Sequence, residues 1–241
     1  MGMQEGYAEL DILRDFIDFI NQQVGVYCDC LSGFEGNKVR IERQISRVTR
    51  PTSRRIEEGQ PVIVWTSLED PSRPDIIHNK ITRSDEFIRA NSEAGFNERQ
   101  ICWSIIVFIF AHWDEKVRPE IANMRGVQPN DVRINALGDL RILRKSIVHN
   151  EGVISAEDYR KIKKMADLFS PNATINLDHD QMHKLFIFLK QAIAELILHH
   201  TGDLPGAPKA SDLTDIAIQN AGTARLRNPY GFWTTSWSPK K

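Results

Sequence analysis

Two side chains in the segment Leu140–Gly152 have the residue types needed to handle a phosphate group and a proton. Arg144 carries a guanidinium, which can hold a phosphate through two parallel hydrogen bonds and stabilise developing negative charge. His149 lies five residues further on. A histidine titrates near pH ~6.5, so it can accept or donate a proton at neutral pH. Asn150 and Glu151 add an amide and a carboxylate beside them.

A helix that begins after residue 130 and runs to about Val148 must position these groups. Its apolar residues recur with a helical period. They form one broad arc made of Leu137, Leu140, Leu143, Ile147 and Val148. Arg144 falls inside this arc, where a guanidinium is costly unless it is paired or opens into a groove. Asp139 and Glu151 are the candidate partners for an internal ion pair.

The spacing of Arg144 and His149 limits how they can work together. On an ideal helix they lie about 140° apart, and His149 belongs to a second polar stripe with Arg141 and Lys145. They can share a site only if the helix ends near His149 or a second chain contributes. The Asn-Glu-Gly sequence at 150–152 can provide such an end.

The remaining chain predicts a helical domain over residues 1–202, interrupted by an irregular insertion at 50–95 and followed by an irregular tail at 203–241. Prolines at 51, 61, 71 and 74 break any helix in the insertion, although Val62–Trp65 is a short run prone to form a strand.

Four further helices are expected from periodicity and capping signals. The first covers about residues 7–48, as one helix or as two, because Gly25 and the stretch from Gly33 to Gly36 weaken the pattern. The others begin at Phe96, at Ser155 and at Asp178, and they end near Pro119, near Pro171 and before Gly202.

Composition narrows the classes of protein to which the chain can belong. The formal net charge is -1, from 31 basic and 32 acidic side chains, so any nucleic-acid contact must come from a local patch. No apolar run approaches the ~20 residues that cross a bilayer, and the N-terminus lacks the pattern of a secretory signal. Three cysteines without zinc-ligand spacing are typical of a reducing compartment. A cytoplasmic protein without membrane contact is therefore expected.

The sequence from Arg144 to His149 resembles the Arg-x(4–6)-His motif of the HEPN superfamily. The wider stretch Asp139–Gly152 is similar to the motif-bearing helix of bacterial HEPN proteins, and Ala111–Glu120 is similar to their penultimate core helix. The resemblance covers about residues 96–200. It implies an all-α, HEPN-like helical bundle that is usually dimeric. Many members are metal-independent endoribonucleases of toxin–antitoxin, CRISPR or anti-phage systems, whereas others are inactive scaffolds or RNA-binding modules.

The resemblance also implies roles for individual residues, with no metal or cofactor. Arg144 and His149 would be catalytic, and Glu151 would orient His149. Substrate contacts would come from the other polar residues of the segment, Arg141, Lys145 and Asn150. In active members Asn or Asp tends to follow the arginine, so Lys145 departs from the pattern.

Two functions therefore remain open. The first is a metal-independent endoribonuclease of HEPN type that acts on RNA as a homodimeric toxin or anti-phage effector. The second is a non-catalytic HEPN-like dimer that serves as a scaffold or as a module binding RNA or protein. The tail carries Tyr230, Phe232, Trp233 and Trp237. It either packs on its own domain or anchors another subunit, an antitoxin or a defence-system protein, since Trp and Tyr are favoured interface anchors.

Overall fold

The computed structural model describes residues 3–48, 63–65 and 81–201, and helices make up most of this part of the chain. The prediction of an all-α fold is confirmed. Two three-residue strands, β1 (Ile63–Trp65) and β2 (Ile81–Arg83), pair antiparallel, as the β-prone run at 62–65 indicates. Most of the predicted insertion and the whole aromatic tail lie outside the described residues. Within the described part, no helix is both long and apolar enough to span a bilayer.

Helix α1 (Met3–Val48) is a single helix of 46 residues, about 69 Å long at 1.5 Å per residue. The alternative of two helices is not observed. Gly25, Gly33 and Gly36 all lie on its exposed side, where an added Cβ would meet nothing within 4 Å. The buried side is therefore continuous, and it includes Leu10, Leu13, Phe16, Ile20, Tyr27, Leu31 and Ile41.

A second helical rod combines α3 (Phe96–His112), a π-helical turn (Trp113–Val117) and α4 (Arg118–Arg125). The sequence predicts that Pro119 kinks or ends this helix, but the chain stays helical through it. Proline lacks an N–H, and its ring crowds the carbonyl four residues earlier. The wider π turn directly before Pro119 takes up this mismatch. The short helix α2 (Ser84–Ala90) precedes the rod, so the end of the segment predicted to be irregular is helical.

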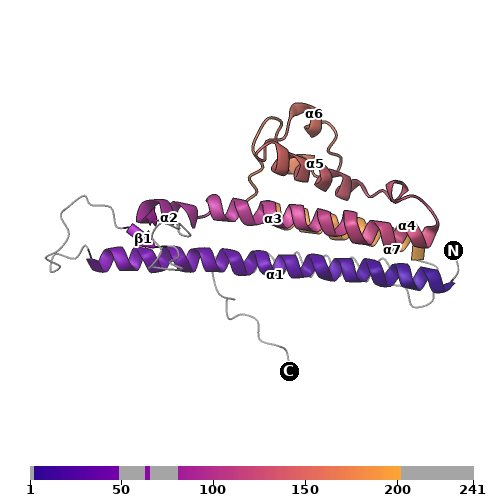
Figure 1. The fold of residues 1–241 in the computed structure, drawn as a ribbon, viewed down its shortest axis with the longest axis horizontal. Helices are drawn as coiled ribbons and strands as arrows, with labels where there is room; N and C mark the ends of the chain where they lie inside the picture. The colour runs from indigo at the N-terminus through magenta and orange to yellow at the C-terminus, as the bar shows by residue number, and fades with distance from the viewer. Residues whose placement is uncertain (1–2, 49–62, 66–80, 202–241) are drawn as a thin grey trace, which may run out of the picture.

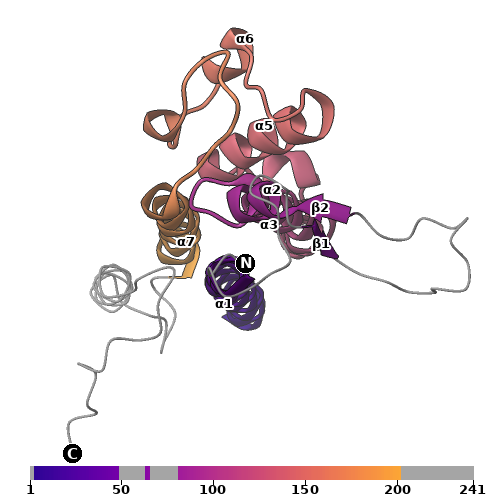
Figure 2. The same cartoon turned by 90° about the vertical axis from the view of Figure 1, so that its left-hand side faces the viewer.

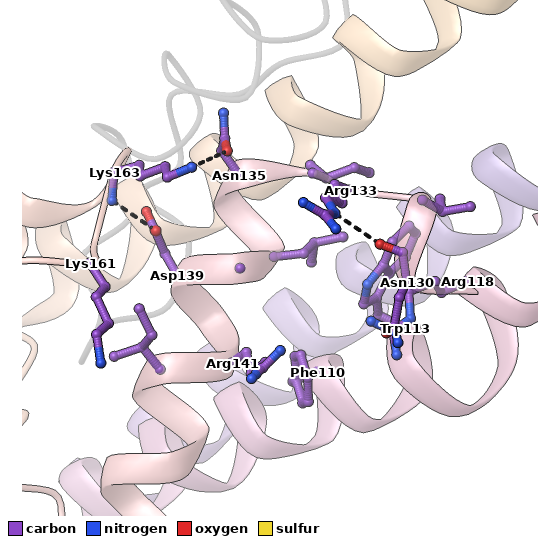
Figure 3. A pocket seen from close by; sticks show the side chains of 15 residues that line it. Phe110, Trp113, Arg118, Asn130, Arg133, Asn135, Asp139, Arg141, Lys161 and Lys163 are labelled. Carbon is purple, nitrogen blue, oxygen red and sulfur yellow. Dashed lines mark hydrogen bonds between the residues drawn. The ribbon is translucent and has the colours of Figure 1, made fainter. Parts of the chain in front are cut away.

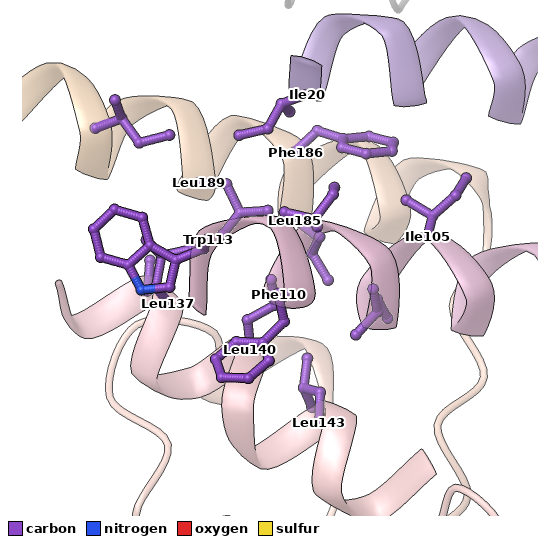
Figure 4. Packing of buried hydrophobic residues seen from close by; sticks show 14 of the residues in the cluster. Ile20, Ile105, Phe110, Trp113, Leu137, Leu140, Leu143, Leu185, Phe186 and Leu189 are labelled. Carbon is purple, nitrogen blue, oxygen red and sulfur yellow. The ribbon is translucent and has the colours of Figure 1, made fainter. Parts of the chain in front are cut away.

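The body of the fold is formed by α1, α3 and α7 (His179–Thr201), and α5 (Asn135–His149) lies on the side of α3 that faces away from α1 (Figures 1 and 2). Side chains of α3, α5 and α7 meet in one core (Figure 4). Helix α7 begins as predicted, with reciprocal bonds of 2.8 and 3.0 Å between Asp178 and Gln181.

The segment between α5 and α7 corrects a prediction. A helix from Ser155 to about Pro171 is expected, but only α6 (Ala156–Tyr159) forms. Ser155 caps it as predicted, because its hydroxyl accepts the backbone N–H of Asp158 at 3.1 Å. Beyond α6, three consecutive backbone N–H groups bond to the carboxylate of Asp139 instead of helical carbonyls. Short 3₁₀ turns occupy Pro129–Asp131 and Ala166–Leu168.

Candidate functional site

Helix α5 carries the predicted motif, and its buried face follows the apolar spacing of the sequence. Leu137, Leu140 and Leu143 are at most 2% exposed and pack against α3 (Figure 4). Arg144 lies at the edge of this face and is half-buried. Val148, which the sequence assigns to the same face, is 49% exposed. It lies about 80° from Leu140 around the helix, at the margin of the contact.

The end of α5 is sharply defined. His149 is its last residue, one beyond the end at about Val148 that the sequence predicts. Glu151 and Gly152 then adopt left-handed backbone angles, with φ of 51° and 80°. The N–H of Gly152 donates to the carbonyl of Ser146 at 2.9 Å, which satisfies a carbonyl in the last turn of the helix. The turn places His149 at an exposed helix end.

A contact with α3 fixes this turn. The indole of Trp103 lies so close to Gly152 that an added Cβ would stand 2.3 Å from the ring. Trp103 also donates from Nε1 to the carbonyl of Ile175 at 2.9 Å, and Ile175 donates to the carbonyl of Gly152 at 2.8 Å. Only glycine suits position 152, since both its φ and this close approach exclude a side chain.

The two motif side chains stay available for other interactions. Neither Arg144 nor His149 makes a side-chain hydrogen bond or ion pair with any residue in the described part of the chain, and the same holds for Asn150 and Glu151. The internal ion pair of Arg144 that the sequence left open is therefore not formed with Asp139 or with Glu151. The five-residue spacing still directs the two side chains about 140° apart, so one chain does not bring them together.

Asp139 has a different role from the one considered in the sequence. Its side chain is buried, and its carboxylate accepts the backbone N–H groups of Lys163, Lys164 and Met165 at 2.9, 2.6 and 3.1 Å. These bonds hold the segment after α6 against α5. The carboxylate compensates its burial in this way and is not left for Arg144.

Lys145 is likewise engaged within the chain. Its Nζ lies 2.8 and 3.1 Å from the two carboxylate oxygens of Asp158, a buried residue of α6. The hydrogen bond from Lys145 is the main reason why the pKa of Asp158 is lowered from its ordinary value. The pair joins α5 to α6, so Lys145, predicted to bind substrate, has a structural partner here.

The Lys145–Asp158 pair predicts a pH-dependent stability difference. Asp158→Asn should lower the free energy of unfolding by about 1 kcal/mol at pH 7, a modest loss because Lys145 is half-exposed. A carboxyl group whose pKa is lowered on folding stabilises the protein above its unfolded pKa, close to 3.8, and loses this effect as pH falls through its lower folded value. Urea unfolding at pH 7, 5 and 3 should therefore show that the difference in free energy of unfolding between wild type and Asp158→Asn becomes smaller only at pH 3. Exposed Asp167→Asn serves as the control, and a difference that persists unchanged at pH 3 would contradict the assignment.

Arg141, the last of the predicted substrate-binding residues, lines an open pocket of about 480 Å³ at the N-terminal half of α5 (Figure 3). Neither Arg144 nor His149 lines this pocket. The other cationic residues around it are Arg118, Arg133, Lys161 and Lys163. Sequence reasoning missed this cluster, because its members come from α4, the segment before α5, α5 itself and the segment after α6, and only folding gathers them.

Comparisons of the chain with protein-family models, curated proteins and solved structures find no match to any of them.

Proposed function

We propose that the protein is a metal-independent endoribonuclease of HEPN type, in which two copies of the chain bring their Arg144 and His149 side chains to one site. The observation that carries the proposal is the contrast along α5. Asp139 and Lys145 each have partners within the chain, whereas Arg144 and His149 have none among the described residues. Burying part of a guanidinium without a partner is unfavourable, so a partner beyond the described residues, such as an RNA phosphate, is the simplest reason to keep it.

The chemistry follows from these two groups. A histidine takes the proton from the ribose 2′-OH, whose oxygen attacks the adjacent phosphorus. The bond from phosphorus to the 5′-oxygen of the next nucleotide breaks, and a second histidine protonates this leaving oxygen. Arg144 stabilises the extra negative charge on the phosphate oxygens. Each chain supplies one such histidine, so a pair of chains provides both the base and the acid.

The proposal predicts RNA cleavage that needs no metal. Purified protein should cleave a mixed RNA pool in the presence of EDTA and leave 2′,3′-cyclic phosphate and 5′-hydroxyl ends, since the 2′-OH is the nucleophile. Mass spectrometry of the fragments identifies these ends. The same sequence with 2′-O-methyl groups should stay intact, because it lacks the nucleophile. Fragments that carry 5′-phosphates, or cleavage that EDTA abolishes, would refute this mechanism.

A non-catalytic interaction module is the second candidate. An exposed aromatic cluster on α1 and α3 favours it: Phe108 is 54% exposed and lies 5.3 Å from Phe19, which stacks on His112 at 4.0 Å between ring centroids. Exposed aromatic groups of this kind are typical of contact surfaces. This candidate predicts that wild-type protein leaves RNA intact both in EDTA and in Mg²⁺.

A further inference from the structure

The pocket at the N-terminal half of α5 combines a hollow with an excess of positive charge. Its cations stand on two sides of the helix, with Lys161 and Lys163 on one and Arg118 and Arg133 on the other (Figure 3). Between them α5 presents Gly138, which is exposed and has nothing within 4 Å of an added Cβ. The absence of a side chain at this position therefore leaves the middle of the pocket open.

Two of the five cations are paired with carboxylates, Arg118 with Asp114 and Lys161 with Glu157, and the other three are not neutralised within the described part of the chain. Among the described residues, Arg133, Arg141 and Lys163 have no carboxylate partner; Arg133 donates to the carbonyl of Asn130, and Lys163 to the side chain of Asn135. The one carboxylate that lines the pocket, Asp139, is already bonded to backbone N–H groups. The first turn of α5 contains no acidic residue, so the positive end of the helix dipole adds to the potential.

The lining indicates how a ligand would be contacted. The two aromatic residues of the pocket, Phe110 and Trp113, are 8% and 3% exposed, so they offer no platform on which a base could stack. Arginine and lysine side chains with amides between them suit phosphate groups. The pocket thus fits a sugar–phosphate backbone better than a nucleobase.

The position of the pocket relative to Arg144 favours a polynucleotide strand as the ligand over a small molecule. Arg141 lies one helical turn from Arg144 on neighbouring faces of α5, where residues three apart are adjacent. Gly138 and Arg144 are separated by about 9 Å along the helix axis, at 1.5 Å per residue. A single-stranded polynucleotide that passes Arg144 would therefore reach the pocket within a few nucleotides.

We infer that this pocket is a binding site for the phosphate backbone of single-stranded RNA, which it holds without reading its bases. The inference rests on the proposed function only in taking RNA as the ligand. The proposed RNA contacts lie at the N-terminal half of α5, whereas His149 lies at its C-terminal end. Binding should be insensitive to sequence and should weaken steeply with salt.

The test is fluorescence anisotropy with a labelled 2′-O-methyl oligoribonucleotide, which the protein cannot cleave. Gly138→Glu places a negative charge in the pocket, and Arg133→Glu replaces a positive charge on its wall with a negative one. Each variant should weaken RNA binding at least tenfold. Loss of a phosphate contact should also reduce the slope of log affinity against log salt by about 0.7. Gly138→Ala, which adds no charge, and Arg14→Glu, on the exposed side of α1, should bind as the wild type does.

Each outcome decides between the proposals. If Gly138→Glu and Arg133→Glu bind RNA as the wild type does, the pocket is not the RNA-binding site, even if the wild type cleaves RNA. If a mononucleotide binds as tightly as the oligonucleotide, the ligand is not a polynucleotide strand. Pocket-dependent binding by a protein that never cleaves RNA supports the pocket and refutes the endoribonuclease. Circular dichroism establishes that every variant is folded.

Discussion

A His149→Ala variant is expected to cleave RNA on the order of 10²–10⁴-fold more slowly than the wild type, which is the usual effect of losing a general acid or base. Its fold should be unchanged, because the His149 side chain is exposed and makes no hydrogen bond or ion pair with a described residue. Arg144→Lys keeps the charge but loses the two-point hold on phosphate, so a large loss is expected there too. Initial rates on one defined RNA in EDTA measure both effects.

A mixing experiment tests the requirement for two copies. When wild-type and His149→Ala chains are produced together in equal amounts, activity should fall to about one quarter, since one dimer in four then has two intact histidines. Chains that act alone would retain half. Val148→Ala, which changes an exposed neighbour in the same turn, is the matched control for local disturbance. Wild-type rates in the His149→Ala variant would remove the residue from the mechanism.

Asp139→Ala is expected to cost about 3 kcal/mol in the free energy of unfolding, the largest loss of stability predicted for a single residue of α5. The substitution leaves three backbone N–H groups without their acceptor, and one of them belongs to the buried Met165. Hydrogen bonds to a charged group are worth more than neutral ones, although water can reach the N–H groups of the exposed residues Lys163 and Lys164. Guanidinium unfolding followed by circular dichroism measures the loss.

Two related variants make this prediction specific. Asp139→Asn keeps one acceptor oxygen in place and should lose clearly less stability than the alanine variant. Asp167→Ala removes an exposed carboxylate from the same segment and should stay within about 0.5 kcal/mol of the wild type. If Asp139→Ala also stays within that range, the carboxylate does not anchor the segment.

The parts of the fold that local patterns determine were predictable. The apolar period of α5 and the Asn-Glu-Gly sequence at 150–152 together indicated most of its buried face, with the exception of Val148, and its end to within one residue. The capping signals at Ser155 and Asp178 were confirmed by hydrogen bonds. In the two caps the deciding hydrogen bonds join residues three positions apart.

Long-range contacts account for what the sequence could not reveal. The helix expected after Ser155 stops early because Asp139, 24 to 26 residues away, accepts N–H groups that a helix would have used. Lys145 finds Asp158 only once α6 packs on α5. The basic pocket arises because the turns of the fold bring Lys161 and Lys163 to one side of a helix that has Arg133 near its start.

The contact between Trp103 and Gly152 limits how far the end of α5, which carries His149, can move. The turn after His149 packs against the Trp103 ring of the central helix α3, so the backbone that carries the histidine is held against the core. The position of each histidine relative to α3 would therefore be set when the chain folds, and ligand binding could change it only by moving this turn or α3. Such a site gains rate from fixed geometry but tolerates little misalignment. Any change that shifts α3 by even a fraction of an ångström should then affect turnover more than affinity.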